Sequence, residues 1–230
     1  MGKHFWKFDC GIYPVVPGLS IKLGDYGFWE GPQWCHKGNI EDIKDYPIYL
    51  TKEKEEIQQD IADSIDVDID GGANAGGQVS ELKAGMSLNF KRKNSQYFLG
   101  KLTNIECYVS IDQEVEPFLK RLSDVGIWKP NYWLAYTIYF SNQFVTLRSK
   151  TAGAKVSLSG QLGLAELKNE VALSTILSKT TSSIEHLACS GAEPQFAGAK
   201  FISLEKNGHF FSRKLKIKYN VTGMDEISFG

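Results

Sequence analysis

The sequence has no long uncharged apolar run, and its opposite charges almost balance. No window holds the roughly 18 uncharged apolar residues that a membrane-spanning helix requires, so we predict no transmembrane helix. The 26 Lys and Arg residues against 27 Asp and Glu residues give a net charge of −1. No overall basic field therefore favours nucleic acid as a partner, although a local basic patch could still bind an acidic membrane.

Cysteine is scarce, and the common catalytic motifs are absent. Cys10, Cys35, Cys107 and Cys189 form no CxxC pair, and no secretory signal precedes them, which favours free thiols in a reducing cytoplasm. No GxSxG, HExxH, GxGxxG or Walker motif appears, and the four histidines are scattered. We therefore predict neither an enzyme nor a metal site or other cofactor.

One stretch imitates a calcium-binding loop. Asp66–Gly71 carries carboxylates at positions 1, 3 and 5 and glycine at position 6, but Gly77 stands where the loop needs a bidentate Glu. The same residues fit a strand with Val67 and Ile69 inward and three aspartates in water, and this is our prediction. The glycine-rich residues 71–77 lack the Lys-Ser/Thr of a phosphate loop and are predicted to form a flexible hairpin tip.

The aromatic stretch between residues 128 and 158 is predicted to hold the centre of the fold. In Tyr132–Phe140 both alternating faces are mostly apolar, which is typical of a central strand covered on both sides. The polar step Ser141–Gln143 separates this segment from a second strand-like one, Phe144–Arg148. A third strand, Lys155–Leu158, follows a turn of small residues.

Two segments are predicted to be helices. Thr51 is a suitable N-cap for Thr51–Ser64, in which isoleucines recur at four-residue spacing. The second helix, Glu116–Val125, has Pro117 in its first turn and ends at Gly126.

The remaining pattern is one of strands and turns. Leu82–Phe90 and Gln96–Val109 flank a basic turn, and Asn207-Gly208 is the strongest hairpin signal in the chain. With 42% hydrophobic residues the chain can bury a sizeable core. We predict an α+β fold: a twisted mixed, mainly antiparallel sheet with flanking helices. It forms one domain over residues 1–230, in which residues 220–230 could be a short regulatory tail.

Aromatic and basic residues suggest sites for membrane contact. Clustered Lys and Arg attract anionic lipids, and aromatic side chains anchor at the headgroups. The candidates are Phe5, Trp6, Lys91, Arg92, Lys93, Lys214, Lys216 and Lys218, with Cys10 as a candidate for lipid modification. The alternatives are an N-terminal segment packed on the core, an idle thiol, and lysines that protect sheet edges from aggregation.

The order of elements between about residues 65 and 160 resembles the pore-forming N-terminal domain of gasdermins. Shared features are an acidic strand and glycine-rich stretch (65–77), the strand Met86–Phe90, and a helix (116–125) leading directly into the strand NYWLAYTIYF. The segment TLRSKTAGAKVSLSG follows in the same order. The resemblance implies a gasdermin-like sheet in which two hairpin regions, Ser64–Val109 and Lys155–Ala188, become membrane-spanning strands.

The function implied by this resemblance is that of a bacterial gasdermin-like cell-death effector, as in antiphage defence. Such a protein is monomeric and cytoplasmic until a protease removes its C-terminal tail. It then moves to the inner face of the cell membrane, binds acidic lipid and assembles into a homo-oligomeric pore. The alternative is a non-enzymatic soluble α+β module that binds a protein or a small ligand.

Overall fold

Strands dominate the computed structural model. It describes residues 13–14, 20–30, 33–46, 48–70, 81–109, 111–165, 167, 182–206 and 215–219. The strands are β1 (Tyr13–Pro14), β2 (Asp25–Glu30), β3 (Gln33–Asn39), β4 (Lys52–Ile65), β5 (Val67–Asp70), β6 (Glu81–Leu82), β7 (Ser87–Phe90), β8 (Gln96–Tyr108), β9 (Trp133–Ser149), β10 (Ala154–Ser157), β11 (Leu162–Gly163), β12 (Ile184–Lys206) and β13 (Leu215–Tyr219). The helices are a 3₁₀ turn, Ile40–Asp42, a π-helix, Ile111–Val115, and α1 (Glu116–Asp124).

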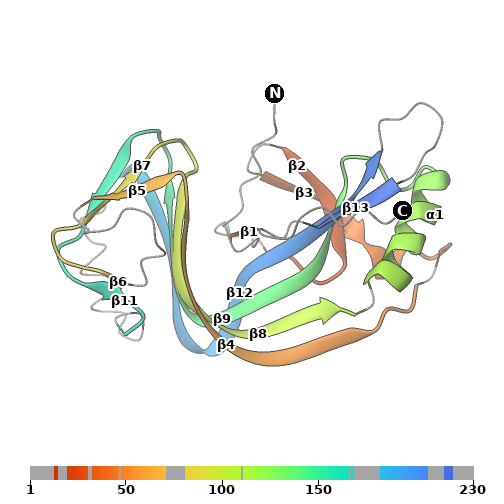
Figure 1. The fold of residues 1–230 in the computed structure, drawn as a ribbon, viewed down its shortest axis with the longest axis horizontal. Helices are drawn as coiled ribbons and strands as arrows, with labels where there is room; N and C mark the ends of the chain where they lie inside the picture. The colour runs from red at the N-terminus through yellow and green to blue at the C-terminus, as the bar shows by residue number, and fades with distance from the viewer. Residues whose placement is uncertain are drawn as a thin grey trace. The chain divides into compact units, whose positions relative to one another are not determined.

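The predicted α+β class with a mainly antiparallel sheet is confirmed, with one short α-helix in the described part of the chain. Within the described ranges the largest sheet has eight strands, and the smaller sheets are β10-β7-β5 and β11-β6. In the largest sheet β9 pairs with β2, β8 and β12, while β4 pairs with β8 (Figure 1).

The prediction of a central strand at Tyr132–Phe140 is confirmed. Residues of both faces are covered: Trp133 and Tyr136 point to opposite sides, and each is only 8% exposed. The strand is longer than predicted, because the polar step at Ser141 does not interrupt it. The Ser141 hydroxyl donates to the Lys101 carbonyl at 2.6 Å, which satisfies this buried polar group without ending the strand.

The predicted helix Thr51–Ser64 is wrong, because these residues form β4. Isoleucines at positions 57, 61 and 65 fit a helical stripe, but positions four apart also share one face of a strand. These residues form a strand rather than a helix because they pair with β8. An ion pair between Lys54 Nζ and Glu106 Oε1 at 2.6 Å joins the two strands. The charged, exposed residues at the start of β4 suit a sheet edge.

The second predicted helix is confirmed as α1, preceded by the π-helix. Pro117 lies in its first turn, where the missing N–H removes no helical hydrogen bond. Gly126 follows its C-terminus with φ of +79°, a left-handed conformation that glycine adopts without steric cost. Phe118, Leu119 and Leu122 bury its apolar face.

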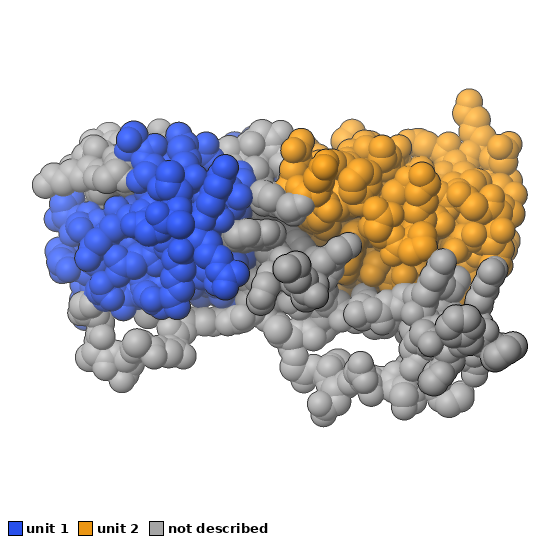
Figure 2. All heavy atoms as spheres, turned by 90° about the horizontal axis from the view of Figure 1, so that it is seen from above, with its two compact units in different colours: residues 1–19, 56–104, 139–198 blue, residues 20–55, 105–138, 199–230 orange. Residues whose placement is uncertain are grey.

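The chain forms two compact units, each made from three separate stretches (Figure 2). Unit 1 comprises residues 1–19, 56–104 and 139–198, and unit 2 comprises residues 20–55, 105–138 and 199–230. The long strands β4, β8, β9 and β12 each contribute residues to both units. The prediction of a single domain stays a prediction.

Unit 1 has a core that is mostly aliphatic. Its buried cluster contains Ala62, Leu82, Leu88, Phe90, Tyr97, Leu99, Val145, Leu147, Ala154, Val156, Leu158, Leu162, Leu167 and Ile184. These residues belong to the two small sheets and to the parts of β4, β8, β9 and β12 that lie in this unit, apart from a few in turns.

Unit 2 is built around aromatic side chains and α1. Trp128 lies 5.5 Å from Tyr26 and 5.8 Å from Tyr132, measured between ring centroids. A second group joins Trp34 to Phe201 at 4.9 Å. Such tilted contacts depend on ring geometry as well as on buried area.

Candidate membrane-interacting site

The basic turn at residues 91–94 joins β7 to β8, and serine side chains hydrogen-bond to its backbone. Asn94 adopts φ of +66°, a left-handed conformation that asparagine tolerates better than most residues. The Ser149 hydroxyl donates to the Arg92 carbonyl at 2.6 Å, and the Arg92 amide donates to Ser95 Oγ at 2.9 Å. The turn is therefore a defined surface feature of unit 1.

Acidic residues on β5 and immediately before it partly neutralise this turn. Lys91 Nζ lies 2.7 Å from Asp68 Oδ1, and Arg92 Nε lies 3.7 Å from Asp66 Oδ2. The Lys93 side chain is exposed, and the described residues offer it no ion pair. Three positive and two negative groups leave a local charge of +1. Exposed ion pairs stabilise a fold by about 1 kcal/mol or less, so these partners could be exchanged for lipid phosphate.

The second basic group is only partly described. β13 pairs with β12 in antiparallel register, which confirms the hairpin pairing that Asn207-Gly208 predicted, although the turn itself lies outside the described residues. In this register Lys216 lies opposite Glu205, and Lys218 lies opposite Ser203. Lys214, Phe5, Trp6, Cys10 and residues 220–230 lie outside the described residues.

The two predicted hairpin regions pair with each other in unit 1. β7 runs antiparallel to β10, with Leu88 opposite Val156, and β6 runs antiparallel to β11, with Leu82 opposite Leu162. β5 forms the other side of β7. Val67 and Ile69 are partly buried while Asp68 and Asp70 are exposed, so the predicted strand is confirmed for Val67–Asp70, whereas Asp66 precedes it with φ of +55°. The glycine-rich residues 71–77 lie outside the described residues.

The interior of this pairing is nonpolar and densely filled. Leu88, Phe90 and Leu99 are fully buried. Burial also raises the pKa of Tyr97, so its phenol stays neutral throughout the physiological range. Any process that separates the two regions must transfer these side chains to another apolar environment.

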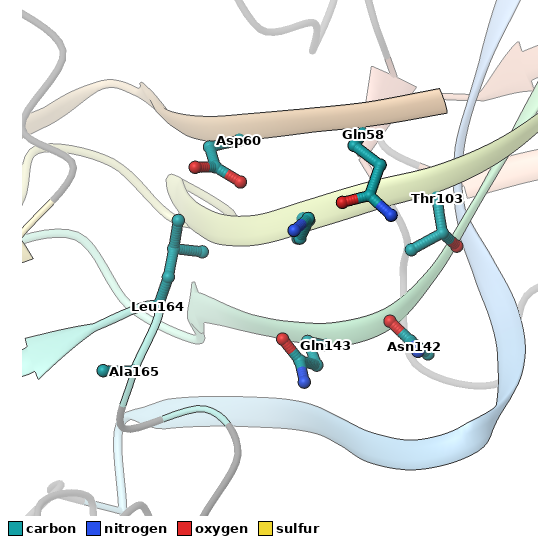
Figure 3. A pocket seen from close by; sticks show the side chains of 8 residues that line it. Gln58, Asp60, Thr103, Asn142, Gln143, Leu164 and Ala165 are labelled. Atoms are coloured by element: carbon teal, nitrogen blue, oxygen red, sulfur yellow. The ribbon is translucent and has the colours of Figure 1, made fainter. Parts of the chain in front are cut away.

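A polar hollow of about 370 Å³ lies on the large sheet within unit 1. Figure 3 shows side chains from β4, β8, β9 and the turn after β11 around it. Its lining residues are Gln58, Asp60, Lys101, Thr103, Asn142, Gln143, Leu164 and Ala165. Sequence reasoning did not find this site, because it placed residues 58 and 60 on a helix. The available signal was a change from apolar to polar side chains along one strand face.

The described residues contain no group of three or more His, Cys, Asp or Glu side chains that could hold a metal ion. No helix among them is long and apolar enough to cross a membrane. Cys35 and Cys107 are free thiols. His186 lies on β12, as the alternating pattern predicted for that segment.

The sequence matches no protein-family profile, and no curated protein matches it significantly.

Proposed function

We propose that this protein permeabilises membranes, as a cell-death effector of gasdermin type with a gasdermin-like sheet. The observation that carries the proposal is the pairing of the two candidate hairpin regions with each other in unit 1. Most residues that would have to rearrange together are thereby gathered in one compact unit, while α1 belongs to the other.

The length of the strands supports this function. β8, which lies in the first candidate hairpin region, has 13 residues, against the five or six of an average strand. At about 3.3 Å per residue, β8 has a length along the chain of roughly 43 Å, more than the ~30 Å hydrocarbon thickness of a bilayer. Extended structure of the necessary length is therefore already present before any rearrangement.

The side chains of the unit 1 core could contact lipid instead of one another. Leu88 and Phe90 alternate with Ser87 and Asn89, so one face of β7 is apolar throughout. A strand with this period can place its apolar face against acyl chains and its polar face against water. The apolar burial that holds unit 1 together would then be largely retained in the membrane.

Binding would begin electrostatically and would require release of the tail. Lipid phosphates become the partners of Lys91, Arg92 and Lys93 and replace Asp66 and Asp68. The lysines of β13 make a second contact with the membrane. Proteolytic removal of residues 220–230 converts a cytoplasmic monomer into a form that reaches the inner face of the cell membrane and oligomerises there.

Dye release from acidic liposomes tests the proposal. The chain ending at Tyr219 should release the dye, and full-length protein should not. Reversal of Lys91, Arg92 and Lys93 to Glu should weaken release, as should raised salt. A matched control reverses Lys22, Lys44 and Lys129, three exposed lysines of unit 2, and should release dye like the parent. A truncated protein that stays monomeric and leaves liposomes intact over a wide concentration range would refute the proposal.

A non-enzymatic soluble binding module is the second candidate, and the polar hollow of unit 1 favours it. It predicts ligand binding by the full-length chain and intact liposomes after truncation.

A further inference from the structure

The polar hollow continues the same sheet face that builds the unit 1 core. Along β8, Tyr97 and Leu99 are core residues, and the next two positions on that face are Lys101 and Thr103. The core therefore ends where the inward-facing positions of this strand become polar.

The neighbouring strands change at the same place. On β4, Ala62 belongs to the core, and Asp60 and Gln58 follow on its face. On β9, Val145 belongs to the core, and Gln143 precedes it on the same face. Three adjacent strands thus present polar side chains together, with Leu164 packed against the core at the boundary (Figure 3).

The charged groups of the hollow have no ionic partners among the described residues. Asp60 and Lys101 both line it, yet they form no ion pair with each other or with any other described residue. The remaining polar groups are the carboxamides of Gln58, Asn142 and Gln143 and the hydroxyl of Thr103. A carboxamide donates and accepts hydrogen bonds, so it suits ligand groups of either kind.

This combination selects among ligand classes. A cation gains Asp60 but is repelled by Lys101, and an anion meets the reverse situation. A neutral polyol satisfies the carboxamides and leaves both charges without a counter-ion. Among the described residues no aromatic side chain lines the hollow, so stacking of a flat ring has no support.

We propose that the hollow binds a small zwitterion, with its ammonium group at Asp60 and its anionic group at Lys101. Its volume lies within the range of small-molecule sites in proteins. The ligand is either a free metabolite or the phosphoethanolamine headgroup of a lipid, since each offers one ammonium group and one anionic group. The inference does not depend on membrane permeabilisation.

Calorimetric titration of full-length protein tests the site with four probes. O-phosphoethanolamine should bind more tightly than ethanolamine, inorganic phosphate or sorbitol. Asp60→Asn and Lys101→Gln should each weaken O-phosphoethanolamine binding by about fivefold or more. Asp60→Asn should leave phosphate binding unchanged or stronger, whereas Lys101→Gln should abolish it, and a purely structural effect would not produce this split.

Asp45→Asn and Lys44→Gln, which change exposed residues of unit 2, serve as matched controls and should bind like the parent. Vesicles with and without phosphatidylethanolamine distinguish the sources: binding that requires both this lipid and Asp60 identifies the headgroup, and binding in solution alone identifies a free zwitterion. Equal binding of sorbitol, unchanged binding by both variants, or no binding of O-phosphoethanolamine overturns the proposal. If one variant fails to fold, the other still decides.

Discussion

The two units differ in what fills their cores. Besides its buried cluster, unit 1 holds one stacked ring pair among the described residues, Phe98 and Phe144, at 5.8 Å between ring centroids. The unit 1 cluster is mostly aliphatic, and Phe90 and Tyr97 are its two aromatic members. In unit 2, Trp128 and Phe201 belong to groups of rings in tilted or edge-on contact, and α1 packs its apolar face in the same unit.

This difference suggests which unit would change in a membrane. The aliphatic face of a strand consists of every second residue. The protein surface that covers this face can be replaced by another apolar surface, including lipid. Ring contacts and a capped helix require particular neighbours, so they are lost when those neighbours separate. We therefore expect unit 1 to rearrange and unit 2 to keep its fold.

Replacing the large side chains of β9 that lie in unit 2 should have the largest effect on the free energy of unfolding. Trp133→Ala and Tyr136→Ala should each lower the free energy of unfolding by about 3–5 kcal/mol, because each ring is covered on its own face of β9. Chemical denaturation measures the loss. Losses below about 1 kcal/mol at both sites would show that β9 is not central, and the exposed Val125→Ala provides a control near zero.

A cavity in the core of unit 1 should destabilise the protein nearly as much as the β9 substitutions do. Its effect on dye release should be opposite to theirs. Leu88→Ala should lower the free energy of unfolding by about 2–5 kcal/mol. Because it weakens the unit that rearranges, it should speed dye release by the chain ending at Tyr219, whereas Trp133→Ala should slow it. If both variants changed the rate of dye release equally, the claim that unit 1 rearranges while unit 2 keeps its fold would be wrong.

Two glycines allow the units to be compared at equal backbone strain. Gly24 in unit 2 has φ of +85° and Gly85 in unit 1 has φ of +86°. A Cβ at Gly24 would lie 2.5 Å from Tyr108 Oη, whereas a Cβ at Gly85 meets nothing within 4 Å. Gly85→Ala should cost about 1–2 kcal/mol of strain, and Gly24→Ala should cost measurably more in the same denaturation assay.

The smallest expected effect is a pH dependence in unit 2. Burial alone would raise the pKa of Glu41, but hydrogen bonds from Lys52 and Tyr108 and the charge of Lys52 outweigh it and lower the pKa below its usual 4.5. A lowered folded-state pKa stabilises the fold above about pH 4.5, and this contribution is lost as pH falls through the folded value.

Glu41→Gln should therefore reduce the free energy of unfolding near pH 7 by no more than about 1 kcal/mol, since the pair is partly exposed. Denaturation at pH 7 and about pH 3 should show the gap between parent and variant closing in acid. A gap that widens in acid would contradict this account of the carboxylate.

The sequence predicted best where one pattern allowed one structure. Tyr132–Phe140 was found because both of its faces are apolar, and α1 because Pro117 and Gly126 mark its ends. β4 was missed because a four-residue spacing of isoleucines fits both a helix and one face of a strand.

The candidate sites show the same limit. Lys91, Arg92 and Lys93 are adjacent in sequence and were found, but their pairing with Asp66 and Asp68 depends on how β5 lies beside β7. The polar hollow joins residues from three strands and a distant turn, so only strand order and register bring them together.

A reversible cross-link between the two hairpin regions would separate rearrangement from binding. Asn89 and Lys155 lie directly opposite each other on β7 and β10. The Leu158 amide donates to the Met86 carbonyl at 3.0 Å. Hydrogen-bonded and non-hydrogen-bonded pairs alternate along antiparallel strands, so Asn89 and Lys155 form a non-hydrogen-bonded pair. The Cα atoms of such a pair are about 4.5 Å apart, which is close enough for a disulfide. Glu30 and Gln33, opposed on β2 and β3, offer a matched cross-link in unit 2.

Dye release from acidic liposomes by the Asn89→Cys, Lys155→Cys chain ending at Tyr219, before and after reduction, tests the central claim most directly. The account predicts liposome binding in both states, no release while the disulfide is intact, and release once a reductant opens it. The Glu30→Cys, Gln33→Cys chain should release dye in both states. Equal release by the oxidised and reduced 89/155 protein, or release by neither, would contradict the claim that unit 1 opens to form the pore.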